Sequence, residues 1–308
     1  PYSFPVVLVN KKDDGEKSRM CINYIKLNEV TVTECYPMPR IEDIQDLLLN
    51  AEFFSVLDLA SGFWHIEVNP NDIHKTAFST NRGHYEWLRM PFGLKNAPIV
   101  FQRVVANLIS KHNMISFAQN YIDDVIIFSK TIDEHWDHLK KLFEMARKEG
   151  MKFKLSKCQF QKTQIKYLGY EISRNSIKPL QSNVEALQKV LAPVDLKTLR
   201  GFLGKANYYT KFLPNRAILF YPLYQLLRKN VKWEWTPECQ KAFETAKEIL
   251  TSSPVIGIFD PKKEIVIYTD ASNKGIGAVL KQHWKEDPNE ETTIAYFSRP
   301  LTSYQKNY

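Results

Sequence analysis

The chain has 308 residues, of which 44% are hydrophobic and 13% aromatic, enough for two or three folding units and too many for a wholly disordered protein. Its 42 lysines and arginines against 34 aspartates and glutamates give a net charge of +8, which favours polyanionic partners without establishing them. The four cysteines form no CxxC pair, so we expect free thiols rather than a zinc site. No apolar run approaches the ~20 residues of a membrane span, and no signal peptide is visible.

The first 172 residues alternate between strand and helix signals. Three hairpins are expected, at 5–9 with 19–24, at 76–80 with 85–89, and at 117–122 with 125–129. The other expected elements are helices at 41–49, 98–109 and 132–149 and strands at 53–59, 152–155 and 166–172. This order predicts an α+β fold with helices packed behind an antiparallel sheet.

Residues after 172 change to a mainly helical pattern. Ser182 and Glu185 form a predicted capping box, with Val184, Leu187 and Leu191 on one face of the helix behind it. The remaining expected elements are helices at 199–212 and 237–250 and strands at 264–269 and 275–280.

Three aspartates are the candidate catalytic residues. Asp123 and Asp124 occupy the turn of the third hairpin, where an aspartate pair by itself is more often structural. Asp58 ends another hydrophobic strand, and neighbouring strands of one sheet could bring it beside Asp123. Clustered carboxylates repel one another, so such a group is best tolerated around a divalent cation, and Mg²⁺ suits it. Two ions about 4 Å apart would serve an in-line phosphoryl displacement, although spacing alone does not establish this site.

Tyr121-Ile122-Asp123-Asp124 resembles the Tyr-x-Asp-Asp box of reverse transcriptases. Other stretches resemble, in order along nearly the whole chain, the polymerase of gypsy-type LTR retrotransposons and their retroviral relatives. They are 5–10 (PVVLVN), 36–41 (YPMPRI), 57–63 (LDLASGF), 76–78 (TAF), 83–86 (GHYE), 90–102 (MPFGLKNAPIVFQ), 155–158 (LSKC) and 167–170 (YLGY). The resemblance implies a right-hand polymerase with an antiparallel-sheet palm and fingers, a helical thumb and the first strands of an RNase H-like domain.

The implied regions are fingers and palm over 1–172, thumb over 173–252 and the N-terminal part of a truncated RNase H domain over 253–308. The implied activity is RNA-directed and DNA-directed DNA synthesis on a primer 3′-end with two Mg²⁺ ions, for which Mn²⁺ could substitute. Expected partners are an RNA or DNA template with its primer, deoxynucleoside triphosphates and the remainder of a Pol polyprotein. Virus-like particles of a retroelement in the cytoplasm are the expected location.

By the same resemblance, Asp58 and Asp123 bind both metal ions and Asp124 completes the triad. Phe63 matches the bulky residue that excludes a ribose 2′-hydroxyl, although an unmatched aromatic there would be read as a core residue. Other implied roles belong to Lys11 and Arg19 (incoming triphosphate), Phe92 and Gly93 (nucleotide pocket) and Leu168 and Gly169 (primer end). Lys157 is expected near the primer end, with a less defined role.

Some residues depart from the family pattern or stay open. Asn23 and Ile25 stand where the family carries Asp and a basic residue behind the fingertip. Asp270 matches the first RNase H carboxylate, and the resemblance puts the other three beyond Tyr308, so no RNase H activity is expected. Tyr208 and Tyr209 fit either contact with a nucleic-acid duplex or core packing.

Two alternatives remain: a second possible metal site at two histidines, and a function other than polymerisation. His135 and His138 could suggest a metal cluster, but we expect them on the solvated face of an amphipathic helix. A catalytically silent, domesticated remnant that binds nucleic acid is the alternative function, and Phe63 disfavours an RNA-synthesising polymerase.

Overall fold

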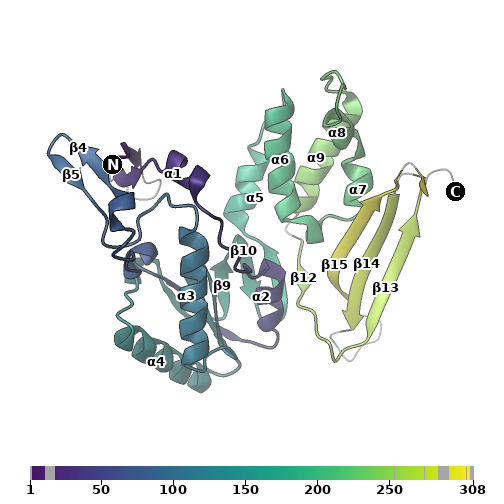
Figure 1. The fold of residues 1–308 in the computed structure, drawn as a ribbon. Helices are drawn as coiled ribbons and strands as arrows, with labels where there is room; N and C mark the ends of the chain where they lie inside the picture. Colours follow the sequence, from purple (N-terminus) through teal and green to yellow (C-terminus); the bar gives the residue numbers. More distant parts are fainter. Residues whose placement is uncertain are drawn as a thin grey trace. The chain divides into compact units, whose positions relative to one another are not determined.

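The computed structural model describes residues 2–10, 18–252, 254–273, 275–283, 291–302 and 304–305 (Figure 1). The chain divides into two compact units, one of residues 1–40 and 52–162 and the other of residues 41–51 and 163–308. None of the helices in the described part of the chain is long and apolar enough to cross a membrane.

The first unit is built on a four-stranded sheet with the order β6-β7-β3-β8. All three strand pairs are antiparallel, and the strands are β3 (Phe53–Asp58), β6 (Ala118–Tyr121), β7 (Asp124–Ser129) and β8 (Gln159–Lys162). β3 and β7 are buried along nearly their whole length, which explains their mainly apolar sequences. Ser55 is a buried polar residue inside β3, whereas Asp58 and Asp124 stand at the strand ends.

Two helices, α3 (Ala97–Lys111) and α4 (Ile132–Lys148), pack against this sheet (Figure 1). Thr131 and Glu134 form a capping box that begins α4, and Leu139, Leu142 and Met145 are buried on its inner face. α3 contributes Phe101, Val105 and Ile109 to the same hydrophobic core. The core therefore fixes α3 against the hairpin of β6 and β7.

Smaller elements complete the first unit. β1 (Val6–Asn10) pairs with β2 (Ser18–Ile22) as predicted. β4 (Phe78–Thr80) pairs with β5 (Gly83–Tyr85), so the second hairpin is present but its second strand lies before the predicted range 85–89. Tyr24, which precedes α1 (Ile25–Val30), is buried and its hydroxyl donates to the carbonyl of Thr76 at 2.8 Å. The short 3₁₀ helices are η1 (Gly62–His65), η2 (Ile73–Thr76) and η3 (Leu155–Lys157).

The second unit begins with α2 (Ile41–Leu47) and contains a four-stranded sheet with the order β12-β11-β10-β9. Its strands are β9 (Gln164–Tyr167), β10 (Tyr170–Ser173), β11 (Ser176–Pro179) and β12 (Ile256–Gly257). The helices that follow β11 are α5 (Gln181–Gln188), α6 (Leu196–Tyr208), η4 (Thr210–Phe212), α7 (Arg216–Leu219), α8 (Tyr221–Leu226) and α9 (Pro237–Thr251).

A three-stranded antiparallel sheet ends the described part of the second unit (Figure 1). β14 (Gly275–His283) lies between β13 (Ile265–Ala271) and β15 (Glu291–Pro300). Helix α7 contacts β14 and β15, and the backbone N–H of Ala217 donates to Ser298 Oγ at 3.0 Å. The two predicted strands are present, and β15 is a third that the sequence pattern did not reveal.

Several predicted elements were wrong in detail. Residues 152–155 make only an isolated bridge between Phe153 and Leu59, and the strand pairing with β3 is β8, further along the chain. The predicted strand at 166–172 is a hairpin of β9 and β10, because Leu168 and Gly169 have positive φ and reverse the chain. Ser182 does not cap α5, whose N-cap is Leu180. Helix α5 ends at Gln188, so Leu191 lies beyond it and is 85% exposed.

Candidate active site

The three candidate aspartates meet at one end of the β3–β7 pair. Asp58 and Asp124 are direct register partners at the last position of that antiparallel ladder. The backbone N–H of Leu59 donates to the carbonyl of Asp123 at 3.2 Å, which extends the contact by one residue. The sequence suggested Asp123 as the neighbour of Asp58, and the direct cross-strand partner is Asp124.

The electrostatics of this end of the sheet are dominated by negative charge. Burial, and then the nearby charge of Asp58, raise the pKa of Asp124, while Lys157 lowers it in part. The Nζ atom of Lys157 is 3.9 Å from Oδ2 of Asp58, so Lys157 lies at the carboxylates in this unit. One partly exposed lysine does not neutralise three carboxylates, and such a group favours a cation.

The carboxylates supply hard oxygen ligands of the kind Mg²⁺ prefers. Among the residues that the structure describes, no three His, Cys, Asp or Glu side chains are arranged closely enough to enclose a metal ion. Mg²⁺ is commonly bound by one or two carboxylates together with water and substrate phosphates. The donor set at Asp58, Asp123 and Asp124 therefore fits an open site completed by a substrate, and not a closed structural one.

The loop that carries Asp123 is strained. Tyr121 and Asp124 are paired, so Ile122 and Asp123 form a two-residue hairpin loop in which Ile122 has φ of 53°. Loops of this kind place glycine at their positive-φ positions. A β-branched residue there costs on the order of 1–3 kcal/mol, which surrounding contacts must offset.

Two neighbouring residues of α3 contact this loop and its surroundings. Oε1 of Gln102 accepts a hydrogen bond from the backbone N–H of Ile122 at 2.6 Å. A Cβ atom placed on Gly62 would lie 2.8 Å from the ring of Phe101 and 3.0 Å from Oδ1 of Asp123. The lack of a side chain at position 62 therefore provides the space in which the Asp123 carboxylate lies. Sequence reasoning missed Gln102 and Gly62, although both lie inside stretches that it singled out.

Phe63 stands next to Gly62 in η1 and is half-buried. Its ring packs against Phe92 at 5.2 Å and edge-on against Phe101 at 5.6 Å between centroids. Gly93 follows with φ of 100°, and a Cβ there would lie 2.9 Å from the carbonyl oxygen of Ile22. The predicted nucleotide-pocket residues Phe63, Phe92 and Gly93 thus lie together, and Phe63 also contributes to the core.

The predicted triphosphate-binding residues are less defined. Lys11 lies outside the described residues. Arg19 is described only by its backbone, which pairs with Val9 between β1 and β2, and its side chain lies outside the described part. Asn23, which departs from the family pattern, accepts the backbone N–H of Ile25 at 3.2 Å and so closes a local turn ahead of α1.

The predicted primer-binding residues Leu168 and Gly169 belong to the second unit. Both have positive φ, 45° and 74°, in the turn between β9 and β10. The Tyr208 hydroxyl donates to the carbonyl of Leu168 at 2.7 Å, and that of Tyr209 to the carbonyl of Gly169 at 3.0 Å. Tyr209 is buried and Tyr208 is 41% exposed, so the tyrosines support this turn from α6 and its C-terminal end.

Asp270 lies in β13 opposite Gly277 of β14 and is exposed. It is far along the chain from the three aspartates of the first unit and is not part of their strand ends. Its assignment to an incomplete RNase H site stays a prediction.

The prediction that His135 and His138 form a solvated face was wrong. His135 is fully buried, with its Nε2 2.7 Å from Ser55 Oγ and its Nδ1 2.8 Å from Ser129 Oγ. His138 Nδ1 also lies 2.8 Å from Ser129 Oγ, and its ring stacks on Phe117 at 3.8 Å. Burial lowers the pKa of His135 to about 4, so it is neutral at physiological pH. The pair joins α4 to β3 and β7 and is a structural network.

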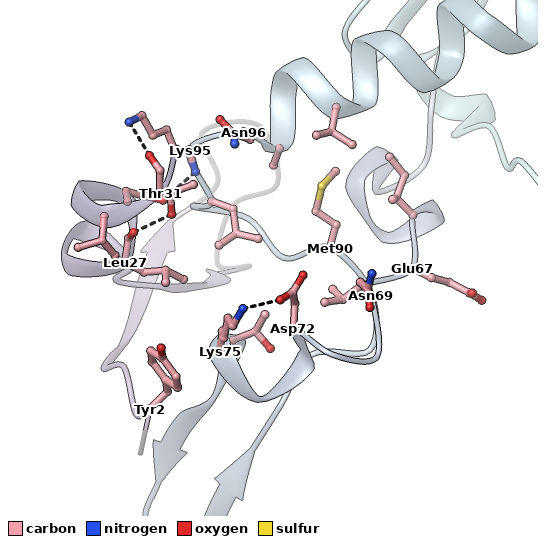
Figure 2. Close-up of a pocket in the computed structure, with 18 residues that line it drawn as sticks. Tyr2, Leu27, Thr31, Glu67, Asn69, Asp72, Lys75, Met90, Lys95 and Asn96 are labelled. Atoms are coloured by element: carbon pink, nitrogen blue, oxygen red, sulfur yellow. Dashed lines mark hydrogen bonds and ion pairs between the residues drawn. The ribbon is translucent and has the colours of Figure 1, made fainter. Parts of the chain in front are cut away.

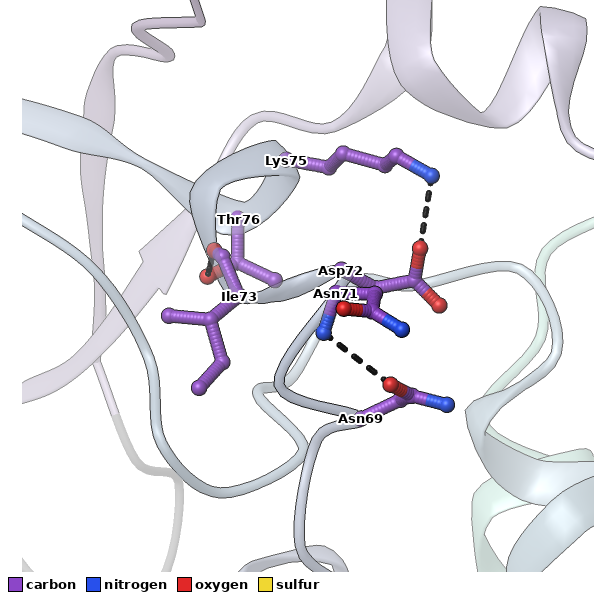
Figure 3. A network of polar contacts seen from close by, with 6 residues as sticks. All are labelled: Asn69, Asn71, Asp72, Ile73, Lys75 and Thr76. Carbon is purple, nitrogen blue, oxygen red and sulfur yellow. Dashed lines mark hydrogen bonds and ion pairs between the residues drawn. The ribbon is translucent and has the colours of Figure 1, made fainter.

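A cavity of about 580 Å³ lies elsewhere in the first unit, between α1, η2 and the start of α3 (Figure 2). Several of its polar side chains bind one another or the backbone. Lys75 Nζ is 2.6 Å from Asp72 Oδ1, Asn69 accepts the N–H of Asn71 at 3.0 Å, and Thr76 donates to the carbonyl of Ile73 at 2.7 Å (Figure 3). These contacts stabilise the turn around η2, and the three aspartates do not line the cavity.

The sequence and the fold of the chain match known proteins. Residues 9–172 match the family described as reverse transcriptase (RNA-dependent DNA polymerase), and residues 235–308 match the RNase H-like domain found in reverse transcriptase. The chain belongs to the reverse transcriptase family. This result confirms the resemblance that its Tyr-x-Asp-Asp box and accompanying motifs indicated.

Curated relatives are polyproteins of transposons. The chain is 39% identical over 316 residues to the retrovirus-related Pol polyprotein from transposon 297 of Drosophila melanogaster, and 38% identical over 322 residues to that from transposon opus. It is 36% identical over 304 residues to the transposon Tf2-3 polyprotein of Schizosaccharomyces pombe. These alignments cover 99–100% of the chain and 22–32% of the relatives, so the chain spans about a third of their length or less.

Solved structures of foamy viral protease-reverse transcriptase share the fold. The structure in complex with double-stranded DNA described as dRH matches with a TM-score of 0.87 at 24% identity, covering 99% of this chain and 52% of that chain. The structure in complex with an RNA/DNA hybrid matches with a TM-score of 0.81 at 24% identity, covering 99% and 40%. The predicted α+β polymerase fold is confirmed by these matches.

Proposed function

We propose that the chain is the polymerase part of a retroelement Pol polyprotein, an RNA- and DNA-directed DNA polymerase that adds deoxynucleoside monophosphates to a primer 3′-end. The observation that carries the proposal is the pairing of Asp58 with Asp124 next to Asp123 at one sheet end. Membership of the reverse transcriptase family supports the same reaction. Template, primer and deoxynucleoside triphosphates are the proposed partners, and virus-like particles in the cytoplasm the proposed location.

The residues of the site have separate proposed roles. Asp58 and Asp123 would hold two Mg²⁺ ions, and Asp124 would complete the carboxylate group. When bound, these ions would activate the primer hydroxyl and neutralise charge on the triphosphate and the departing pyrophosphate. Phe63 would form the wall at the sugar of the nucleotide, with Phe92 and Gly93 beside it. Lys11 and Arg19 would bind the triphosphate, and Leu168 and Gly169 the primer end.

Primer extension on poly(rA)·oligo(dT) with Mg²⁺ tests the proposal. We expect the wild-type chain to extend the primer, and Asp123→Asn to reduce the rate by about a thousandfold or more while leaving nucleic-acid binding intact. Asp133→Asn, on the exposed first turn of α4, is the matched control and should extend at the wild-type rate.

The alternative is a catalytically silent, domesticated remnant that binds nucleic acid. Binding without extension by the wild-type chain, unchanged in Asp123→Asn, would favour the remnant and exclude the polymerase. Binding by either protein should weaken steeply as salt rises, because lysines and arginines displace counterions from phosphates. A flat salt response would contradict the proposed contact with the nucleic-acid backbone.

A further inference from the structure

We propose that Gln102 is a positioning residue for the carboxylate site. Its side-chain amide holds the Ile122–Asp123 loop in its strained conformation, and so fixes the direction in which Asp123 projects. This role deepens the proposed polymerase function and rests on it, since it concerns the same three aspartates. It gives a role in metal binding to a residue of helix α3, although the carboxylates themselves are on the strands and the hairpin loop.

The hydrogen bonds of Gln102 join the hairpin loop to the strand that leads into it. Oε1 accepts the N–H of Ile122 at 2.6 Å, and Nε2 donates to the carbonyl of Asn120 at 3.1 Å. The side-chain amide of Asn120 in turn donates to the backbone carbonyl of Gln102 at 3.4 Å. Gln102 is 2% exposed and Asn120 is fully buried. The amide of Gln102 cannot rotate without losing both of its hydrogen bonds in a place that water does not reach.

The backbone of the loop shows why such an amide is needed. Ile122 has φ of 53°, which a β-branched residue rarely adopts. If the loop relaxed to a negative φ, the N–H of Ile122 would turn away from Gln102 and leave a buried oxygen without its donor. The hydrogen bond therefore opposes relaxation of the residue directly before Asp123.

The residue next to Gln102 restricts the surroundings of the Asp123 side chain. The ring of Phe101 and Oδ1 of Asp123 both lie within 3.0 Å of the position of a Cβ atom on Gly62. Consecutive residues of α3 therefore act together, with Phe101 bounding the space at Gly62 and Gln102 holding the backbone of the loop. Asp58, on β3, is held separately by its pairing with Asp124. Rotation of the loop would change the distance between the Asp123 and Asp58 carboxylates, and displacements of about 1 Å can lower rates a hundredfold.

A purely structural role for Gln102 makes a different prediction. A buried amide that only satisfies backbone groups would, when removed, lower the stability of the first unit without changing metal binding by the folded protein. A positioning residue would change metal affinity in protein that is still folded. In addition, glycine at position 122 should compensate for its loss, because glycine adopts positive φ without strain.

The experiment compares Gln102→Met, which keeps the length of the side chain and removes its amide, with Ser129→Ala. Ser129 lies at the opposite end of β7 from Asp124 and is bound to His135 and His138, so its loss should destabilise the same sheet away from the loop. Binding of Mn²⁺ to the full chain without nucleic acid is measured by electron paramagnetic resonance. The Mg²⁺ concentration for half-maximal primer extension and the melting temperature are measured in parallel.

We expect Gln102→Met to weaken Mn²⁺ binding and raise the Mg²⁺ requirement by about tenfold, in the range seen for residues that orient metal ligands. Ser129→Ala should change neither by more than about twofold at a similar loss of melting temperature. In the background of Ile122→Gly, Gln102→Met should recover most of the lost affinity. Gln102→Asn, which keeps an amide that is too short to reach Ile122, replaces Gln102→Met if the latter does not fold.

Equal Mn²⁺ affinity in wild type, Gln102→Met and Ser129→Ala would overturn the positioning role, as would the lack of any recovery by Ile122→Gly. A wild-type chain that binds Mn²⁺ through Asp123 but extends no primer would remove the proposed polymerase function. In that case the Mn²⁺ comparison would still decide the role of Gln102.

Discussion

Asp58 and Asp124 face each other across the last register pair of the β3–β7 ladder. Directly opposed like charges destabilise a sheet. The burial of Asp124 adds to this cost, and only Lys157 is placed to reduce it among the groups that shift its pKa. The site is therefore expected to carry a stability cost that a bound cation relieves.

Asp124→Asn should stabilise the protein in the absence of divalent cations. Because burial and Asp58 raise the pKa of Asp124, the folded state holds this proton more strongly than the unfolded state does. Stability is then lost as pH rises from the ordinary aspartate pKa through the raised pKa, and stays lost above it. We expect a melting temperature at pH 7.5 that is higher by a few degrees, with the difference from wild type shrinking toward pH 4. Asp133→Asn should give no such gain, and an equal gain in both variants would contradict the local cause.

Phe63→Ala should admit ribonucleotides. Removal of the ring opens the wall beside Phe92, where one additional hydroxyl on the sugar could then fit. We expect the ratio of kcat/KM for dATP over ATP to fall by about tenfold or more. Some loss of stability, about 1–3 kcal/mol, should accompany it because the ring also packs on Phe101. Trp64→Ala, the adjacent and more exposed aromatic, is the control; an unchanged ratio in Phe63→Ala would refute the role of this wall.

The stability of the protein should fall as pH decreases from about 6.5 to about 4 through His135. Its pKa is lowered to about 4 by burial, so the unfolded state takes up a proton in this range and the folded state does not. The loss from this one residue amounts to at most about 3 kcal/mol. Urea unfolding measured between pH 4 and 7 should show that the unfolding free energy of His135→Gln changes less with pH than that of the wild type. Thr131→Ala, which removes the cap of α4, should instead lower stability by about 1 kcal/mol at every pH.

Gly93→Ala should destabilise the first unit more than Gly150→Ala does. Both glycines have positive φ, 100° and 70°, so both variants strain the backbone. A Cβ at position 93 would also lie 2.9 Å from the carbonyl oxygen of Ile22, whereas no atom lies within 4 Å of a Cβ at position 150. We expect a loss of about 1 kcal/mol for Gly150→Ala and at least twice that for Gly93→Ala, measured by urea unfolding. Equal losses would show that β2 can shift away from a Cβ atom at position 93 without a further loss of stability.

The sequence by itself indicated the family and the strands and helices with strong periodicity, and it singled out the three aspartates as candidates. β3 and β7 are mainly apolar runs, ended by Asp58 and begun by Asp124, and α6 buries Leu199, Phe202, Leu203 and Ala206 at helical spacing. These patterns are local in the chain, so each can be recognised without knowing which other elements the strand or helix packs against. Motif order then gave the family, which spacing between distant aspartates did not.

Only the tertiary structure decided which distant residues meet. The pairing of Asp58 with Asp124, the hydrogen bond from Ile122 to Gln102 and the burial of His135 depend on strand register and on helix packing. A histidine at the start of an amphipathic helix looks solvated in the sequence, and it is buried here because Ser55 and Ser129 supply its hydrogen bonds. Register is set by the packing of whole faces, so no single stretch of the chain contains that information.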